Sequence, residues 1–170
     1  MVNVSKIWLT LAIICTILFG ALATTRIVND VQFDYGCGTY LKRAADANSV
    51  EMAKDELAKA ISFAEQKGLT EGNTGIIFKN PKNDVGFWYD NMKACYQELE
   101  DLPEDVTSLE KTNVLMKLRE SLLDTGESTS VTLPSYISIY PNNLLYALWG
   151  WISLISAVIF WVAFGVTKDY

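Results

Sequence analysis

The sequence predicts a mainly α-helical membrane protein, with two transmembrane helices flanking an antiparallel extracytoplasmic bundle of roughly three to four helices. Three observations predict this fold class. An uncharged apolar run, Leu144–Val166, lies near the end of the chain, and a second apolar run, Ile7–Thr25, lies near its start. The segment between them is acidic and has apolar residues at helical spacing.

The run Leu144–Val166 spans 23 residues without a charged side chain. At about 1.5 Å of rise per residue, such a helix crosses the roughly 30 Å hydrocarbon layer with some tilt. A helix satisfies its own backbone in lipid, so we interpret the run as a transmembrane helix. The alternative is a buried core helix of a soluble protein, which is seldom this long and uncharged.

The first run follows a short start with one lysine, Lys6, and ends at Ala21-Leu22-Ala23. A basic start, an apolar core and a small-x-small ending are typical of a secretory signal. The run reaches Thr25 before its first charge, about 19 residues, which is longer than a usual signal core. We therefore favour a retained anchor over a cleaved signal.

The flanking charges predict the orientation. Lys6 and Lys168 lie outside the two runs, and the positive-inside rule places them in the cytoplasm, although Arg26 at the other end of the first run opposes this. The middle then lies outside, in the periplasm of a bacterial inner membrane, and its lack of glycosylation sequons favours a bacterial origin. The predicted division is a cytoplasmic N-terminus (1–6), transmembrane helix 1 (7–25), an extracytoplasmic acidic helical domain (26–143), transmembrane helix 2 (144–166) and a cytoplasmic C-terminus (167–170).

The middle domain shows start and stop signals for three helices. Asn48 with Glu51 predicts a capping box for a helix that ends at Lys67-Gly68. Asp84 predicts the cap of a helix over 85–102, and Thr107 with Glu110 a capping box for a helix from 108 to about 124. Before these helices, the triplet Gly36-Cys37-Gly38 interrupts a helical pattern and predicts a kink or a close neighbour.

The net charge is −6, and because Lys6, Lys168 and Asp169 together carry +1, the middle domain carries −7. An acidic domain argues against a nucleic-acid partner, which needs a basic face to neutralise phosphates. No histidine occurs, which removes the commonest general base and neutral metal ligand. With no phosphate-binding loop and no catalytic set, we expect no enzyme, no cofactor and no metal site.

Cys37 and Cys95 both lie in the middle domain and could form one disulfide, whereas Cys15 lies within the first apolar run. The alternative is two free thiols on different helices, since spacing does not show whether the two Cα atoms lie within about 7 Å.

Small residues recur every four positions along the first run, and a matching pair lies in the second run. At this spacing they form one face of each helix, which lets two helices approach closely in lipid. We predict a helix-packing stripe of Ala12, Thr16, Gly20 and Thr24 against Ser153 and Ala157, while chance remains an alternative because apolar helices are rich in small residues.

Two groups of aromatic residues are candidate contact sites. The first group lies where the chain enters the second run and predicts a membrane-interface belt, with a stacking site for an aromatic or sugar ligand as the alternative. The second group lies on the helix after Asp84. We expect its residues to belong to the core, with a ligand site or a partner contact as the alternatives. The belt comprises Tyr136, Tyr140, Tyr146, Trp149 and Trp151, and the second group Trp88, Tyr89 and Tyr96.

The order anchor, extracytoplasmic helices, anchor resembles the ectodomain layout of bacterial chemoreceptors, in the order of elements alone. The chain stops four residues after Val166, so we expect no cytoplasmic signalling part. We expect a non-enzymatic accessory or structural membrane protein whose partners are the bilayer and another membrane protein or a second copy. The alternative is an extracytoplasmic ligand-binding sensor module with a separate output partner.

Overall fold

The computed structural model describes residues 4–75, 79–103, 105–125, 129–139 and 143–168. Across these residues the chain is mainly helical, with five helices when the continuous run of α1 and α2 is counted as one, and it divides into two units. One unit contains residues 1–28 and 142–170, and the other contains residues 29–141. Below, the first is called the helix-pair unit and the second the core unit.

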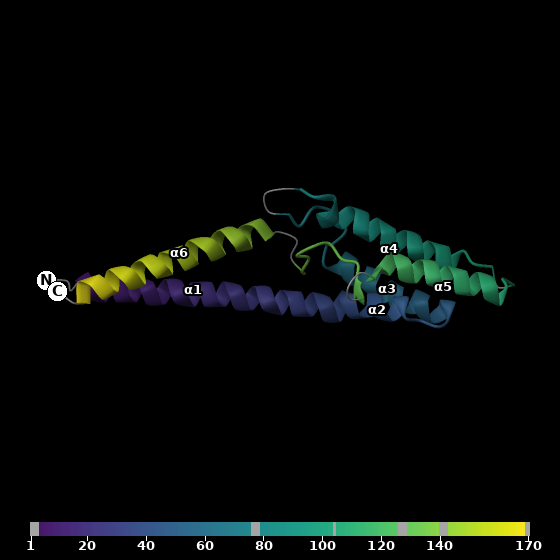
Figure 1. Ribbon diagram of the computed structural model, residues 1–170, viewed down its shortest axis with the longest axis horizontal. Coiled ribbons are helices and arrows are strands. Elements are labelled where there is room, and N and C mark those ends of the chain that lie inside the picture. The colour runs from purple at the N-terminus through teal and green to yellow at the C-terminus, as the bar shows by residue number, and fades with distance from the viewer. Residues whose placement is uncertain (1–3, 76–78, 104, 126–128, 140–142, 169–170) are drawn as a thin grey trace. The chain divides into compact units, whose positions relative to one another are not determined.

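The helix-pair unit contains the first part of α1 (Val4–Phe33) and all of α6 (Asn143–Lys168). The two helices pack together, and α1 begins at the end of the unit where α6 ends (Figure 1). Most of their large apolar side chains are exposed. Both helices are long and apolar enough to cross a membrane.

In the core unit, the helical run that begins with α1 passes through a π-helical turn, η1 (Asp34–Gly38), into α2 (Thr39–Ala45). The expected interruption at Gly36-Cys37-Gly38 is confirmed, and its form is one widened turn within a continuing helix. A Cβ on Gly36 would lie only 2.1 Å from Cε2 of Phe63. Glycine therefore lets the ring of Phe63 pack directly on the helix backbone.

The N-cap of helix α3 (Val50–Gln66) lies one residue later than predicted. Ser49, not Asn48, is the N-cap, and its hydroxyl accepts a 3.2 Å hydrogen bond from the Met52 amide. The prediction of Asn48 was wrong because both residue types cap well and sequence spacing does not separate neighbours. The predicted end is confirmed: Gly68 has φ +67°, and the Leu69 amide donates to the Ala64 carbonyl at 2.8 Å.

The predicted caps of the next two helices are confirmed. A short 3-10 turn (Pro81–Asn83) precedes α4 (Val85–Glu100), whose first-turn Phe87 amide donates to Asp84. Thr107 and Glu110 form the reciprocal capping box of α5 (Ser108–Leu122).

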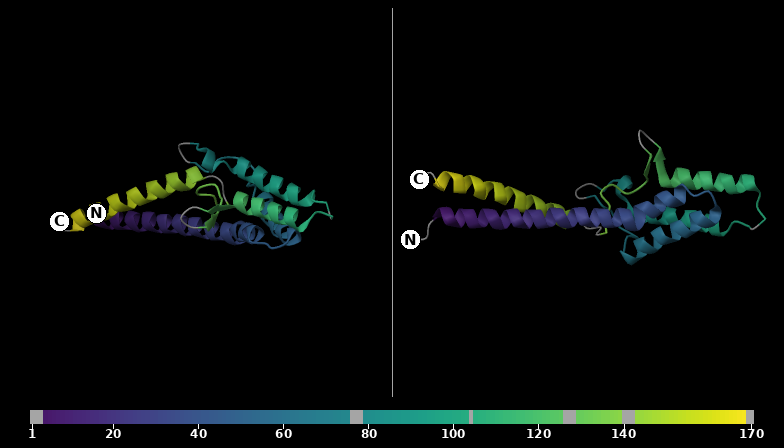
Figure 2. Two further views of the ribbon diagram at one scale, coloured as in Figure 1. Left: turned by 45° about the vertical axis from the view of Figure 1, so that its right-hand side comes forward. Right: turned by 90° about the horizontal axis from the view of Figure 1, so that it is seen from below.

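Helix α5 ends earlier than predicted because the following residues form a two-stranded antiparallel hairpin (Figure 2). Strand β1 (Leu123–Thr125) pairs with β2 (Thr129–Val131), and Leu123 lies opposite Val131. The Thr132 amide continues the pairing by donating to the Leu122 carbonyl at 2.8 Å. The hairpin turns the chain back along the core unit.

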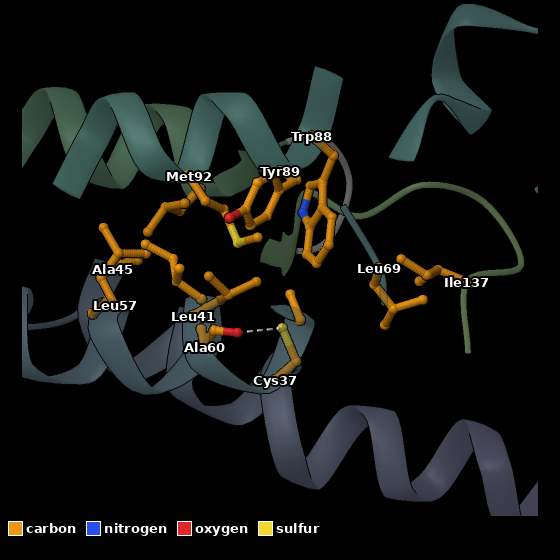
Figure 3. Close-up of a cluster of buried hydrophobic side chains, with 14 of the residues drawn as sticks. Cys37, Leu41, Ala45, Leu57, Ala60, Leu69, Trp88, Tyr89, Met92 and Ile137 are labelled. Atoms are coloured by element: carbon orange, nitrogen blue, oxygen red, sulfur yellow. Dashed lines mark hydrogen bonds between the residues drawn. The ribbon is translucent and has the colours of Figure 1, made fainter. Parts of the chain in front are cut away.

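The hydrophobic core of this unit forms where α2, α3, α4 and α5 meet (Figure 3). Leu41 from α2, Leu57 from α3 and Met92 from α4 are fully buried and point toward one another. Leu118 and Leu122 from α5 complete the cluster, together with Ile137 and Ile139 from the segment after β2 (residues 132–139), which is called the return segment below. The core therefore depends on segments that lie far apart in the sequence.

One buried charge joins α2 to α3. Glu56 is 6% exposed, and its Oε1 atom lies 3.0 Å from Arg43 and 2.8 Å from Lys59. Two cations on one carboxylate oxygen offset the cost of burying its charge.

Candidate functional site

The helix-pair unit contains part of the predicted packing stripe at a close helix contact. Ala12, Ser153 and Ala157 are buried there, whereas Thr16, Gly20 and Thr24 are exposed. Small side chains at Ala12 and Ala157 leave room for the neighbouring helix, as packing in lipid requires.

Two larger contacts flank these small residues. Trp161 of α6 donates a 3.2 Å hydrogen bond from its indole Nε1 to the Thr16 hydroxyl of α1. The ring centroids of Trp8 and Phe160 lie 5.7 Å apart. Thr16 thus contributes through a hydrogen bond, which helix spacing alone did not reveal.

Polar side chains on these two helices bond to the backbone of their own helix. The hydroxyls of Thr10, Thr16, Thr24 and Thr25 each donate to a carbonyl four residues earlier, at 2.8 to 2.9 Å. Thr167 of α6 donates to the Ala163 carbonyl at 2.8 Å. Satisfied hydroxyls can lie in an apolar environment without the desolvation cost of an unpaired polar group.

The residues of the predicted aromatic belt lie in two places. Tyr146, Trp149 and Trp151 are in the first turns of α6, where Tyr146 is half-buried and both tryptophans are exposed. Tyr136 belongs to the core unit, is exposed, and has a left-handed backbone with φ +63°. Tyr140 lies outside the described residues.

The second aromatic group contributes to the core. Trp88 and Tyr89 are buried, and Tyr96 is half-buried and packs against the core. Trp88 also lines a groove of about 530 Å³ between α4 and the return segment that follows β2. The structure therefore places Trp88 both in the core and beside a groove.

The groove beside Trp88 mixes apolar and polar side chains. Exposed Phe87 and buried Met92 contribute from α4, and Thr132 and Ser135 from the return segment. The indole Nε1 of Trp88 is buried and has no hydrogen-bond partner among the residues that the structure describes. Sequence reasoning identified Trp88 but missed the opposite wall, because that wall depends on the fold of the hairpin.

A second groove, of about 730 Å³, lies between the first helical run and α3 and was also missed. Val31, Tyr35 and Tyr40 line one side, and Phe63 and Lys67 line the other. Tyr35 is 73% exposed, which is unusual for a large aromatic side chain. The signal that could have found it is the four-residue apolar spacing from Val31 to Tyr35, in which each residue directly follows an aspartate, Asp30 or Asp34.

Tyr89 makes a polar contact between α4 and α3. Its hydroxyl donates a 2.6 Å hydrogen bond to Oε1 of Glu65. This hydrogen bond to a carboxylate, followed by burial and the negative charges of Glu65 and Asp90, raises the pKa of Tyr89 to about 12.

The contribution of this hydrogen bond should therefore depend on pH. Tyr89→Phe is expected to lower the free energy of unfolding by about 1 kcal/mol at pH 7. The pKa of Tyr89 is higher in the folded protein than in the unfolded chain. The hydrogen bond therefore contributes fully to stability below pH 10, and this contribution is lost as pH rises through about 12. Urea unfolding of the wild type and the variant between pH 7 and pH 12 measures the difference, and a constant difference across this range would refute the assignment.

The three cysteines are free thiols. Cys37 is fully buried and lies 3.8 Å from the Ala60 carbonyl, while Cys95 is half-buried on α4. In the structure the two thiols are unbonded, with Cys37 in the π-helical turn and Cys95 on α4. Burial raises the pKa of Cys37 to about 12 and also raises the pKa of Cys95.

The thiols should consequently react in order of exposure. At pH 8 we expect Cys37 to be unreactive toward a maleimide in the folded protein, because it is buried and protonated, and to react once urea unfolds the core unit. Mass spectrometry of the labelled peptides measures this. Rapid labelling of Cys37 under native conditions would show that the core opens near α2.

Among the described residues, no group of three or more His, Cys, Asp or Glu side chains is arranged to hold a metal ion. Some acidic residues form ion pairs with lysine or arginine, such as Glu98 with Lys117 at 2.7 Å. No protein-family model matches the chain, and no curated protein or solved structure is significantly similar to it. Functional inference therefore depends on the physical properties of the two units.

Proposed function

We propose that this chain is a non-enzymatic integral membrane protein that acts through protein contacts of its helical core unit and its two anchors. The observation that carries the proposal is the exposure of the apolar helices α1 and α6. Within their most apolar windows, 6% and 11% of the residues are buried. A core helix of a soluble protein would be mostly buried, so these exposed side chains need lipid or a protein partner to cover them.

The internal hydrogen bonds of the two helices support the same conclusion. The hydroxyls of Thr10, Thr24 and Thr25 bond to their own helix, so these residues add no unpaired polar group. Trp161 and Thr16 pair with each other across the helices. These bonds are what a two-helix anchor requires.

The proposed topology places both termini in the cytoplasm and the core unit outside. Lys6 and Lys168, beyond the two runs, support this orientation under the positive-inside rule. Trp149 and Trp151, exposed in the first turns of α6, suit the headgroup region on the outer side. In a bacterium the core unit would then lie in the periplasm.

The accessory role is supported by exposed apolar side chains on the core unit itself. Tyr35 on the first helical run, Phe87 on α4 and Leu109 on α5 are each at least 70% exposed. These residues lie outside the apolar runs, so lipid tails do not cover them. Protein contacts are a physical reason for keeping such side chains at the surface.

Purification of the full chain from native membranes in mild detergent tests the proposal. We expect a partner protein, or a second copy, to copurify and to be identified by mass spectrometry. Matched variants at surface positions, Phe87→Ala and Leu109→Ala, then show which apolar contact holds the partner. A monodisperse monomer that carries only a bound small molecule would refute the accessory role.

The second candidate function is a ligand-binding module whose signal is carried by another protein. The observation that favours it is the groove of about 530 Å³ beside Trp88, which has both apolar and polar walls, as ligand sites usually do. Native mass spectrometry would detect such a ligand. Its loss in Phe87→Ala, with retention in Leu109→Ala, would assign it to this groove.

A further inference from the structure

The groove of about 730 Å³ beside Tyr35 differs in charge from the acidic domain that contains it. Lys59 and Lys67 line this groove, and no aspartate or glutamate is among the described residues that line it. The middle domain (26–143) carries −7, and the groove beside Trp88 has two aspartates and one lysine in its walls. The groove beside Tyr35 is therefore a local positive site, and all of its residues belong to the core unit.

Two aromatic rings give this groove an apolar floor, and a lysine lies over each ring. Tyr40 and Phe63 are half-buried and pack against the hydrophobic core. The ammonium group of Lys59 lies 5.7 Å from the ring centroid of Tyr40, and that of Lys67 lies 5.9 Å from the ring centroid of Phe63. Attraction between cation and ring keeps both charges at the groove.

The core unit does not fully neutralise these two lysines. Among the described residues, no carboxylate forms an ion pair with Lys67. Lys59 pairs with Glu56, but the same carboxylate oxygen also pairs with Arg43, so two cations share one negative charge. The groove therefore keeps a net positive charge that an acidic group can approach.

The exposure of Tyr35 favours a protein as the occupant. Tyr35 lines the groove and is nevertheless 73% exposed. Small ligands usually have about 70–90% of their surface enclosed by their site, and a side chain that projects this far encloses little. A partner surface laid over the groove would instead cover it, and tyrosine is one of the residue types enriched at the strongest protein contacts.

The backbone on both sides of the groove favours a helical partner segment. One side belongs to α1, η1 and α2, and the other to α3, so the amides and carbonyls of both sides are bonded within their own helices. An extended segment would find no strand edge to pair with among the lining residues. An amphipathic helix needs none, because it satisfies its own backbone and is recognised through its side chains.

The length of the groove suits a short helix. Its lining residues run from Val31 to Tyr40 on one side and from Ala58 to Lys67 on the other. At about 1.5 Å of rise per residue, each side is roughly 13 Å long, which matches about two and a half turns of a helix.

We propose that the groove beside Tyr35 binds an acidic amphipathic helix of a second membrane protein. The apolar face of that helix contacts Tyr35 and the rings of Tyr40 and Phe63, and its carboxylates pair with Lys67 and Lys59. The inference rests on the proposed accessory function, because it names the surface and the partner chemistry through which that function acts. Charge also gives specificity, since the acidic surface elsewhere on the domain repels the same helix.

Site-specific photo-cross-linking in native membranes tests the proposal. In the full-length chain, p-benzoylphenylalanine replaces either Ser62, which is exposed in the groove, or Thr112, which is exposed on α5 and serves as the control. Mass spectrometry then identifies the peptide joined to each position. From position 62 we expect a segment of another membrane protein, with carboxylates beside apolar residues spaced three and four apart. Position 112 should give at least about ten-fold less of this product, as for a contact weaker by a factor of ten in affinity.

Charge variants test the recognition without moving the cross-linker. Lys67→Glu should lower the yield from position 62 at least about ten-fold, whereas Lys67→Arg should retain it. Lys93→Glu is the matched control, because Lys93 lies 5.6 Å from the ring centroid of Tyr89 but outside the groove, and it should leave the yield unchanged. Replacing the identified carboxylate of the partner by lysine should restore the cross-link to Lys67→Glu. Circular dichroism checks that each variant is folded.

Four results would overturn the proposal: no protein joined to position 62, a second copy of this chain or lipid alone joined there, a partner segment without carboxylates, or equal effects of Lys67→Glu and Lys93→Glu. The proposed accessory function would survive each of them if a partner still copurifies and cross-links through another surface. A monomer without any protein partner would refute both, so the two failures are distinguishable.

Discussion

Replacing Leu41 by alanine is expected to lower the free energy of unfolding of the core unit by about 2–5 kcal/mol. Leu41 is fully buried and points toward Leu57 and Met92 at the centre of the core (Figure 3). Truncation removes apolar contacts and leaves a cavity that helices from three chain segments must close. Urea unfolding of the full chain in detergent, followed by circular dichroism, measures the loss.

The matched control for this variant is Leu109→Ala. This variant makes the same chemical change on α5, but Leu109 is 70% exposed. The free energy of unfolding should therefore change by no more than about 0.5 kcal/mol. Equal losses in the two variants would show that Leu41 is not at the centre of the cooperative core.

Gly36→Ala is the second variant with a large expected effect, about 1–3 kcal/mol of lost stability. Alanine normally stabilises a helix relative to glycine by about 1 kcal/mol. Here the added Cβ would lie 2.1 Å from the ring of Phe63, so either the ring or the π-helical turn must move. The steric cost should exceed the gain in helix propensity.

The sign of the effect should reverse when the ring is removed. In a Phe63→Ala background, Gly36→Ala is expected to be neutral or to stabilise by up to about 1 kcal/mol. Thermal unfolding of the four proteins in this double-mutant cycle measures the coupling. Additive effects would mean that the contact between Gly36 and Phe63 does not constrain the helix.

Features that depend on a few neighbouring residues were predictable from the sequence. Asp84, the Thr107–Glu110 box and the glycine at position 68 act within one helical turn, and the structure has each of them where spacing predicted. The misplaced cap at Ser49 shows the limit of this reasoning, because two adjacent residues have nearly equal capping ability.

Features that depend on tertiary pairing were not predictable in the same way. Leu123 falls within the helix predicted from 108 to about 124, but its pairing with Val131 places it in a strand. The groove beside Trp88 needs that hairpin for its second wall, and the groove beside Tyr35 needs the packing of α3 on the first helical run. Neither wall can be inferred from residue spacing alone.

The contacts between α1 and α6 show the same difference between local and tertiary features. Helical spacing identified Ala12 and Ala157 as small residues for close packing, and both are buried. It did not reveal the hydrogen bond from Trp161 to Thr16, because that contact depends on how two distant helices are aligned. Physical packing decides which residue of a predicted stripe touches a partner.

Cysteine accessibility in intact cells tests the proposed topology most directly. In a Cys95→Ser background, a single cysteine is introduced by Ser5→Cys, beside Lys6, or by Ser130→Cys, exposed on β2. A membrane-impermeant maleimide is expected to label the cysteine at position 130 in intact bacterial cells, and the one at position 5 only after permeabilisation. Labelling at position 5 but not at position 130 in intact cells would contradict the proposed placement of the core unit outside the membrane.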